Sequence, residues 1–302
     1  MLRLTLARAV LGLRATNVRG FASSSAASVP VVLPHANTAH DSVTINVGNL
    51  TGEHATTSPT AFGAHLESSL ASFRGAGKTA VWLKLPIAAS DYIPVAAAQG
   101  FKFHNAEGDE ATLALWIKEG VSSRIPPFAT HQVGVGGLVL RGGDNDPYGS
   151  GRPLEALVVK EARHSYGVKF KLPGGLADLG EDFGEAACRE VLEETGVTTV
   201  FEKLLTVRHQ HGAQFGRSDI YATAQLRAVS EDIVLDNYEL EFARWMCLKE
   251  LRSQTDHAML IQAIDVALGA GAVAMAETEL ASVVPGRRPY KLYHAALPVA
   301  EK

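Results

Sequence analysis

The chain has 302 residues, of which 46% are apolar and 20% charged, and its formal net charge is −4. This composition is typical of a soluble globular protein, and the length is sufficient for two domains of ordinary size. Four arginines fall within the first 20 residues, and without them the formal net charge is −8, which argues against bulk binding to nucleic acid.

The first 28 residues are rich in Arg, Ser, Ala and Leu and contain no acidic residue. This composition is typical of an organellar transit peptide, and the spacing of the arginines would place charge along one side of an amphipathic helix. Apolar runs that are short and broken by Arg argue against a secretory signal and against a membrane span. We predict a targeting peptide over residues 1–28, with mitochondrial localisation and a plastid or the cytosol as alternatives. A tail with an accidental Arg bias is the competing interpretation.

A linker is expected at residues 29–59, which are rich in Thr, Asn, Ser and Pro and offer one candidate strand at 42–47. A small α/β domain is expected at residues 60–121. Its predicted elements are helices at 64–73 and 86–98 and strands at 78–84, 101–104 and 112–117.

Four aromatic residues of this domain, Trp82, Phe101, Phe103 and Trp116, lie on predicted strands. Core packing is the expected role of these rings, rather than stacking on a ligand. His104 is expected to be a hydrogen-bonded structural residue, with ligand contact as the alternative. The sequence of this region contains no catalytic constellation, so we expect a dimerisation or scaffold role, which makes a homodimer one candidate assembly.

The Pro-Pro pair within residues 122–131 marks the predicted domain boundary. Strands are predicted at 132–141 and 154–163, joined by the loop GGDNDPYGSG at 142–151. This loop has the composition of a calcium or phosphate loop, but it lacks the spaced oxygen ligands of the first and the helix-entry Lys of the second. A hairpin connection is therefore preferred.

The most informative stretch is residues 175–197, GLADLGEDFGEAACREVLEETGV. Asp182 and Glu185 have the spacing of a capping box, which predicts a helix that begins near Asp182. Gly196 fits the position just beyond its end, where a left-handed conformation is needed. The small thiol of Cys188 is expected to be buried within this helix, and two cysteines do not form a disulfide framework.

Three glutamates, Glu190, Glu193 and Glu194, lie close together on the surface of this helix, because each residue turns it by about 100°. Like charges at these spacings repel one another, and the negative end of the helix dipole adds to the repulsion. Oxygen ligands of this kind suit Mg²⁺ or Mn²⁺. A solvated acidic face is the alternative interpretation. It is disfavoured because no Lys follows four residues later and because the turn at 172–175 can bring backbone carbonyls to the same ion.

The spacing of Gly, Glu, Arg-Glu, Glu-Glu and Gly in this stretch matches the Nudix box, and the chain resembles the Nudix hydrolases over residues 131–272. The resemblance implies an α/β/α sandwich with a mixed sheet. The preceding stretch AVWLKLP…GFKFHN…LALWI resembles the pre-Nudix α/β domain. That domain is found in plant ADP-ribose/NADH pyrophosphatases and in the fibroblast growth factor antisense protein.

The resemblance also implies roles for single residues. Glu193 and Glu194 would be metal ligands, and Glu190 either a ligand or the base that activates water. Arg189 would pair with Glu181 and hold the carboxylates in place. Further metal ligands would be the carbonyl of Gly175 and an acidic residue just before an apolar strand, with Glu239 and Glu241 as the candidates.

Residues 208–219 look like the RQxH…FG(K/R)SD segment of the same subfamily. A phosphate-bearing ligand with a stacking base would suit such a wall of basic and aromatic side chains, and a solvated loop is the alternative for any single residue. The substrate-binding candidates are Arg208, His211, Phe215, Arg217 and Asp219.

Near the carboxyl end, Trp245 and Met246 are expected to pack on the core, and a closing helix is predicted at 249–268. Residues 273–302 are expected to form a tail or an edge strand.

The activity that the resemblance implies is Mg²⁺-dependent hydrolysis of a nucleoside diphosphate linked to another group, with Mn²⁺ as a substitute. ADP-ribose or NADH cut to release AMP is the preferred substrate, and the coenzyme A signature of one Nudix branch is not visible. A nucleotide-pool sanitising pyrophosphatase and a non-catalytic protein-binding module are the alternatives. The shared architecture alone does not decide between them.

Overall fold

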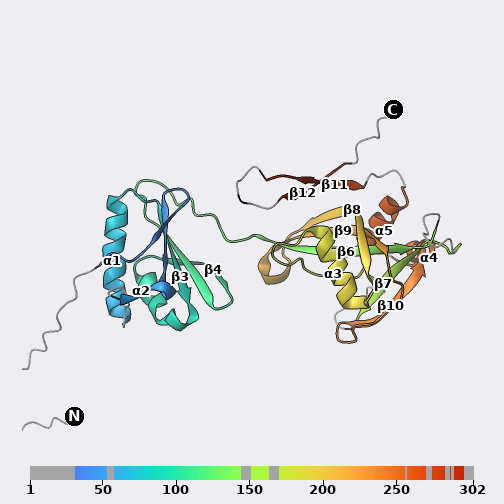
Figure 1. Ribbon diagram of the computed structural model, residues 1–302, viewed down its shortest axis with the longest axis horizontal. Coiled ribbons are helices and arrows are strands. Elements are labelled where there is room, and N and C mark those ends of the chain that lie inside the picture. Colours follow the sequence, from blue (N-terminus) through green and yellow to red (C-terminus); the bar gives the residue numbers. More distant parts are fainter. Residues whose placement is uncertain are drawn as a thin grey trace, which may run out of the picture. The chain divides into compact units, whose positions relative to one another are not determined.

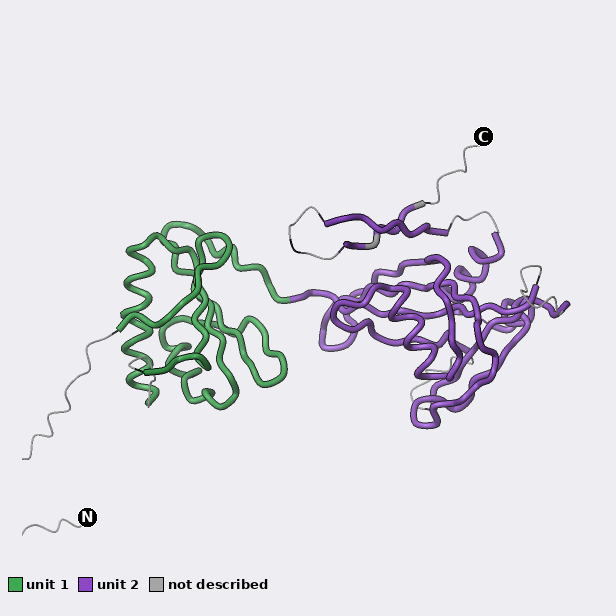
Figure 2. Tube along the Cα trace, viewed as in Figure 1, with its two compact units in different colours: residues 1–128 green, residues 129–302 purple. Residues whose placement is uncertain are grey.

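The computed structural model describes residues 31–52, 58–143, 151–162, 170–255, 257–269, 274–282, 286 and 289–295. The chain divides into two compact units between Phe128 and Ala129 (Figure 2). The predicted targeting peptide and most of the predicted loop at 142–151 lie outside the described residues. No helix in the described ranges is both long and apolar enough to cross a membrane.

The first unit contains a five-stranded sheet of order β1-β2-β3-β5-β4, in which β2 and β3 are parallel and the other neighbours antiparallel (Figure 1). Ser58 begins its longest helix by accepting a hydrogen bond from the Ala61 amide at 3.2 Å. The strands are β1 (Ala36–Thr38), β2 (Ser42–Asn46), β3 (Ala80–Pro86), β4 (Lys102–Glu107) and β5 (Glu110–Trp116). The helices are α1 (Pro59–Gly75) and α2 (Ile93–Ala98), with 3-10 turns η1 (Val47–Asn49) and η3 (Ile87–Tyr92).

The predicted linker at 29–59 is wrong in part, because residues within it belong to the sheet. Alternation along β2 buries Val43 and Ile45 in the core beneath α1, together with Leu33. The backbone amide of Leu33 also donates to Ser69 Oγ on α1 at 2.8 Å. The first unit therefore begins well before residue 60.

The sequence predicted that the four aromatic residues on the strands of this unit pack in its core, but the structure places only one of them there. Phe101 is buried, but 68% of Phe103 is exposed because β4 is the edge strand of the sheet. Trp82 and Trp116 are only partly buried, because alternation places them on the sheet face opposite the core residues Val81 and Leu83.

The second unit contains a seven-stranded mixed sheet of order β10-β7-β6-β9-β8-β11-β12, in which only the β6–β9 pair is parallel (Figure 1). Its strands are β6 (His131–Arg141), β7 (Glu155–Glu161), β8 (Thr199–Gln210), β9 (Ser218–Ala228), β10 (Leu240–Cys247), β11 (Met275–Leu280) and β12 (Tyr290–Ala295). Its helices are α3 (Phe183–Thr195), α4 (Leu248–Gln254) and α5 (Ala258–Ala267), with a 3-10 turn η4 (Gln214–Gly216).

Helices cover both faces of this sheet, which confirms the predicted α/β/α sandwich. Side chains of α3, such as Val191, pack against Val135, Val139 and other residues of one sheet face. Side chains of α4 and α5, such as Ile264, pack against Leu138 and its neighbours on the opposite face. As predicted, Met246 is buried and Trp245 packs against the core.

Strands β6 and β7 pair only at Leu140 and Arg141, and the segment before α3 fills the gap where they diverge. Lys171 exchanges two backbone hydrogen bonds with Val159 of β7, at 2.9 and 3.0 Å. Further on, the carbonyls of Pro173 and Gly175 accept hydrogen bonds from β6 amides at 2.9 and 2.8 Å. The loop that leads into α3 is thus held by the sheet on both sides, so the helix starts from a fixed position.

The closing helix predicted at 249–268 is two helices, α4 and α5. Side chains in the connection accept hydrogen bonds from backbone amides that a continuous helix would pair with carbonyls. The His257 amide donates to Thr255 Oγ1 at 3.2 Å, and the Leu260 amide donates to His257 Nδ1 at 3.3 Å. The second bond caps the start of α5. Downstream, β11 joins the sheet edge through Met275 and Leu204, so part of the predicted tail extends the sheet.

Candidate active site

Helix α3 has the ends that the sequence predicted. Asp182 and Glu185 form a capping box, in which the Asp182 amide donates to Glu185 Oε2 at 3.0 Å. Gly196 closes the helix with a φ of 70°, and its amide donates to the carbonyl of Leu192 at 2.8 Å. Cys188 is a free, partly buried thiol packed against the core of the second unit.

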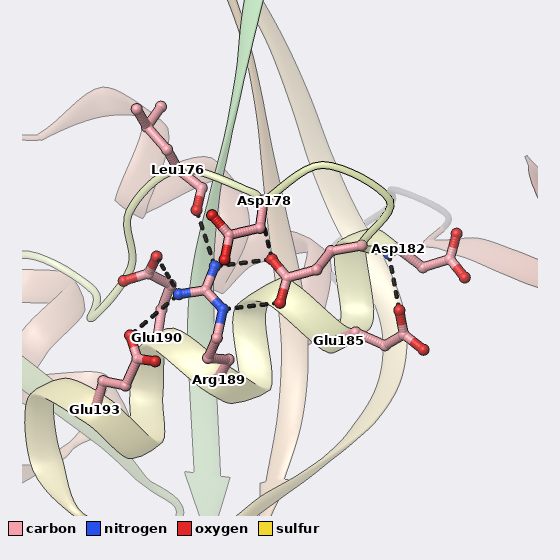
Figure 3. A network of polar contacts seen from close by, with 8 residues as sticks. Leu176, Asp178, Asp182, Glu185, Arg189, Glu190 and Glu193 are labelled. Atoms are coloured by element: carbon pink, nitrogen blue, oxygen red, sulfur yellow. Dashed lines mark hydrogen bonds and ion pairs between the residues drawn. The ribbon is translucent and has the colours of Figure 1, made fainter. Parts of the chain in front are cut away.

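The guanidinium of Arg189 lies at the centre of a polar network (Figure 3). It makes two hydrogen bonds to Glu181, from Nε to Oε1 at 2.7 Å and from Nη2 to Oε2 at 2.8 Å. Its Nη1 contacts Glu190 at 2.9 Å and Glu193 at 3.1 Å, and its Nη2 also donates to the Leu176 carbonyl at 3.0 Å. Hydrogen bonds from Arg189 lower the pKa of Glu181 to about 2. The predicted Arg189–Glu181 pair is confirmed, and the same side chain partly neutralises two more glutamates.

The carboxylate of Glu190 lies directly against the backbone of Gly175. A Cβ atom at position 175 would stand 2.6 Å from Glu190 Oε2, so only glycine leaves room for this approach. Burial raises the pKa of Glu190; hydrogen bonding and charge from Arg189 oppose the shift, whereas the charges of Glu193 and Glu239 add to it. The Gly175 carbonyl accepts a hydrogen bond from Val135, which leaves its second lone pair for another partner.

Glu194 is the most buried member of the cluster, with 5% of its surface exposed. Burial raises its pKa to about 7; the charge of Lys171 and a 3.2 Å hydrogen bond from the Gly174 amide lower it, and the charges of Glu190 and Glu239 raise it further. In contrast, 59% of the Glu193 side chain is exposed. The three glutamates of α3 therefore occupy three different environments.

The structure distinguishes the two candidates for the further acidic ligand. The loop before β10 caps the carboxyl end of α3, since the Asp236 amide donates to the Glu194 carbonyl at 3.1 Å. This loop brings Glu239 close enough for its charge to raise the pKa of both Glu190 and Glu194. Glu241 instead pairs with Lys160 at 2.6 Å and has 54% of its side chain exposed. Both residues are exposed, but only Glu239 is close enough for its charge to act on the cluster.

The chemistry of this cluster fits a hard divalent cation, because its donors are carboxylate and carbonyl oxygens. Burial is the main cause of the raised pKa values of Glu190 and Glu194, and repulsion from neighbouring glutamates adds to it, so a nearby cation would stabilise their charged forms. In the described part of the chain, however, no three His, Cys, Asp or Glu side chains already converge closely enough to enclose a metal ion. Glu190 and Glu193 instead contact Arg189, at 2.9 and 3.1 Å.

The five residues predicted to bind substrate do not lie together in the structure. Arg208 on β8 forms an ion pair with Asp219 on β9, on the sheet face that α5 covers. His211 contacts Ser218 Oγ at 2.9 Å and stacks edge-on with the ring of His209, with centroids 4.5 Å apart. At the tip of the same connection, Phe215 is 86% exposed, with a φ of 55°, and Arg217 is exposed. Of the five, Arg208 and Asp219 share a neighbour with the carboxylate cluster, since their charges and those of Glu190 and Glu194 all act on Tyr221.

A cavity of about 190 Å³ adjoins the cluster between the sheet and α5. Its lining includes Lys171, Arg208, Tyr221, Thr223 and His257. The side chains of Lys171 and Tyr221 are near enough to Glu194 to interact with its charge, and burial raises the pKa of Tyr221. Residues that line the cavity therefore interact electrostatically with the carboxylate cluster.

Two polar atoms of the lining lack a hydrogen-bond partner among the described residues, which indicates a polar ligand. Thr223 is fully buried, and within the described ranges neither its Oγ1 nor Arg208 Nε has a hydrogen-bond partner. The ring of Tyr221 lies against β6 where Gly134 and Gly136 leave it room, since a Cβ at position 136 would stand 2.4 Å from the Tyr221 hydroxyl oxygen.

Sequence reasoning missed Lys171, Tyr221, Thr223 and His257. Alternation from Asp219 is the signal that could have found two of them, because residues 219, 221 and 223 share one strand face. Lys171 and His257 come from separate segments that only the tertiary fold brings to this face.

Comparison with known proteins identifies the class. The family model described as the Nudix hydrolase domain matches residues 33–117, and the NUDIX domain model matches residues 130–264. A human protein, nucleoside diphosphate-linked moiety X motif 6, is 37% identical over 247 residues, which cover 79% of this chain and 74% of the human protein. The chain therefore belongs to the Nudix hydrolase family.

Two further relatives illustrate the range of similarity. Nudix hydrolase 8 of Arabidopsis thaliana is 39% identical over 198 residues, covering 65% of this chain, which spans about half (51%) of the plant protein's length. A solved NUDIX hydrolase from Nitrosomonas europaea is 26% identical with a TM-score of 0.37, and the match covers 46% of this chain and 89% of that one. The predicted membership of this family, with a domain preceding the Nudix module, is confirmed.

Proposed function

We propose that the protein hydrolyses a nucleoside diphosphate linked to a second moiety, with ADP-ribose or NADH as substrate and AMP as one product. The observation that carries the proposal is the cluster of the buried Glu194, the partly buried Glu190 and the exposed Glu239 beside a cavity that contains unpartnered polar atoms. The first feature suits activation of water at a diphosphate, and the second suits recognition of the attached group.

Mg²⁺, or Mn²⁺ in its place, is the cofactor that this donor set favours. Glu190, Glu193, Glu194 and Glu239, with the Gly175 carbonyl, are the residues that would hold it. When bound, such an ion neutralises diphosphate charge and lowers the pKa of the attacking water.

The chain's own residues provide orientation and charge. Arg189 holds the carboxylates through its contacts with Glu181, Glu190 and Glu193. Glu190, packed on Gly175 with a raised pKa, is suited to accept a proton from water. Lys171 and Arg208 line the cavity, where each pairs with a carboxylate of the chain, and their further N–H groups suit the substrate's phosphates.

A substrate panel tests this proposal. The full chain is incubated with ADP-ribose, NADH, NAD⁺, ADP-glucose, coenzyme A and 8-oxo-dGTP, each with Mg²⁺, Mn²⁺ or EDTA, and products are separated by chromatography. We expect metal-dependent release of AMP from ADP-ribose or NADH. Preference for 8-oxo-dGTP would support a nucleotide-pool sanitising enzyme, and a folded, metal-binding protein inactive on every substrate would favour a protein-binding role.

The location is a separate proposal. We infer mitochondrial import from the acid-free, Arg-rich composition of residues 1–28. Full-length chain and a version lacking these residues, both with a carboxyl-terminal fluorescent tag, should differ, with only the former in mitochondria. Plastid or cytosolic fluorescence from the full-length chain would contradict the proposal.

A further inference from the structure

The first unit contains a cavity on the sheet face opposite its core. Alternation along β3 directs Val81 and Leu83 toward α1 and leaves Trp82 on the other face, where Trp116 of β5 joins it. The cavity has a volume of about 580 Å³, within the usual range of ligand sites. Its lining comprises residues 39–42, Thr79, Ala80, Trp82, Trp116, Lys118, Val121 and residues 124–126.

Hydrogen bonds hold one wall of this cavity over the sheet. The indole Nε1 of Trp116 donates to the carbonyl of Val121 at 2.8 Å. Nearby, His104 Nε2 lies 3.0 Å from the carbonyl of Pro126, and its ring stands edge-on to Trp82 with centroids 5.0 Å apart. His104 is therefore a structural residue, as predicted. These bonds also hold the segment from 121 to 126 in place, so that it forms one wall of the cavity.

The opposite wall is the turn between β1 and β2. His40 and Asp41 both adopt left-handed backbone conformations, with φ of 60° and 56°, which are unfavourable for residues with a Cβ. Two bonds from Thr79 hold them there: its hydroxyl donates to the His40 carbonyl at 2.6 Å, and its amide donates to the Asp41 carbonyl at 3.0 Å. Both walls thus have defined positions relative to the two indoles.

The charges that line the cavity are predominantly positive. Lys118 and Arg124 are exposed, and in the described part of the chain no carboxylate forms an ion pair with either. Asp41 is the one acidic residue of the lining. This local excess contrasts with the chain as a whole, whose formal net charge is −4. Unpaired cations beside aromatic surfaces favour an anion that also carries a planar ring.

We propose that this cavity is a second, non-catalytic binding site for a mononucleotide or a similar heteroaromatic ring bearing a phosphate. The indoles of Trp82 and Trp116 offer apolar surface for the ring, and stacking on such surfaces contributes about 1–3 kcal/mol per base in other proteins. Lys118 and Arg124 would bind the phosphate. Every lining residue belongs to the first unit, so the proposal does not depend on the chemistry of the second.

Intrinsic fluorescence provides the test. The chain has three tryptophans, and Trp245→Phe leaves Trp82 and Trp116 as the only indoles. In this variant and without metal, we expect saturable quenching by AMP. Adenosine and inorganic phosphate, which each carry half of the proposed determinant, should bind at least about tenfold more weakly.

Charge variants locate the site. Lys118→Ala with Arg124→Ala should weaken AMP binding at least about tenfold and leave adenosine binding unchanged, because only the phosphate contacts are removed. Arg74→Ala with Lys102→Ala is the matched control: both residues are exposed cations of the same unit outside the cavity, and this pair should bind AMP normally. Calorimetry on chains that keep Trp245 gives the same comparison if Trp245→Phe folds poorly.

Three outcomes would overturn the proposal. The first is the lack of saturable AMP binding to the first unit. Equal loss of affinity in the control pair and the cavity pair is the second, because it would indicate general attraction of an anion. Phosphate alone binding as tightly as AMP is the third, because the indoles would then contribute nothing.

Discussion

The two units differ in how they hold charge. In the second unit, Glu194 is buried and Glu190 partly buried, and the charge of the exposed Glu239 acts on both. In the first, the cations Lys118 and Arg124 stand exposed beside aromatic rings. Burial magnifies electrostatic energies, whereas water and salt screen exposed charges. Repulsion among the glutamates therefore costs the second unit folding stability, whereas the exposed cations of the first unit cost it little. Variants of both units can test this contrast.

The largest effect is expected from Glu194→Gln. Loss of a buried carboxylate from the proposed metal site should lower turnover at least about 100-fold, beyond the 10- to 100-fold usual for residues that only support ligands. Stability without metal should rise slightly, because a buried charge is removed. Steady-state hydrolysis of ADP-ribose and urea unfolding in EDTA measure the two effects, and undiminished turnover would refute the assignment.

The pH dependence of stability provides a second test. The pKa of Glu194 is raised to about 7 in the folded chain from an ordinary value of 4.5, so the folded state binds the proton more tightly. Its contribution to the free energy of unfolding is therefore fully present below pH 4.5 and is lost as the pH rises through 7. The loss is at most about 3 kcal/mol.

Urea unfolding of the metal-free chain between pH 4.5 and 8 measures this loss. Glu194→Gln removes only this titration, so the difference between the two curves isolates it from the histidines, which titrate in the same range. Curves that stay parallel would show that Glu194 is not under electrostatic strain.

The third test separates the acidic candidates near β10. Glu239→Gln should lower kcat/KM by about 10- to 100-fold, because its charge acts on both Glu190 and Glu194. Glu241→Gln, the same change two residues later at an exposed ion pair, should leave kcat/KM within about twofold. The reverse ranking would make Glu241 the functional residue.

A smaller effect is expected from Arg189→Lys. The ammonium keeps the charge but cannot reproduce the paired hydrogen bonds to Glu181 at 2.7 and 2.8 Å. We expect about a tenfold fall in kcat with little change in KM, because positioning is lost and substrate contacts are kept. A change confined to KM would instead place Arg189 against the substrate.

The smallest effect concerns the first unit. Lys118→Ala with Arg124→Ala should alter the free energy of unfolding by less than about 0.5 kcal/mol at any pH from 5 to 8, since both side chains are exposed. Thermal unfolding followed by circular dichroism measures it. A large destabilisation would show that these cations stabilise the fold, and the contrast between the units would then fail.

Local sequence patterns predicted the features that depend on local interactions. The capping box at Asp182 and the left-handed Gly196 were found where the spacing predicted them, and the Arg189–Glu181 pair where the family resemblance implied it. The bonds from Arg189 to Glu190 and Glu193 agree with its expected role in holding the carboxylates, but compensation of their charge was expected only from a Lys four residues later.

Features set by the whole fold could not be predicted in this way. Whether Trp82 faces the core depends on which side of the sheet carries α1, and alternation alone does not reveal it. Likewise, the closeness of Glu239 depends on a loop that caps α3, and the cavity unites Lys171, Tyr221 and His257 from three separate segments. These three features depend on tertiary contacts, which local sequence patterns do not contain.

The absence of side chains at Gly134 and Gly136 of β6 determines the shape of the neighbouring cavity. The ring of Tyr221 occupies the space that side chains there would fill, and that ring forms one side of the cavity. A single methyl group at position 136 would require the tyrosine ring to move and would change the shape of the cavity. Under the proposed function, one substitution in the sheet would then alter substrate preference without replacing any of the glutamates.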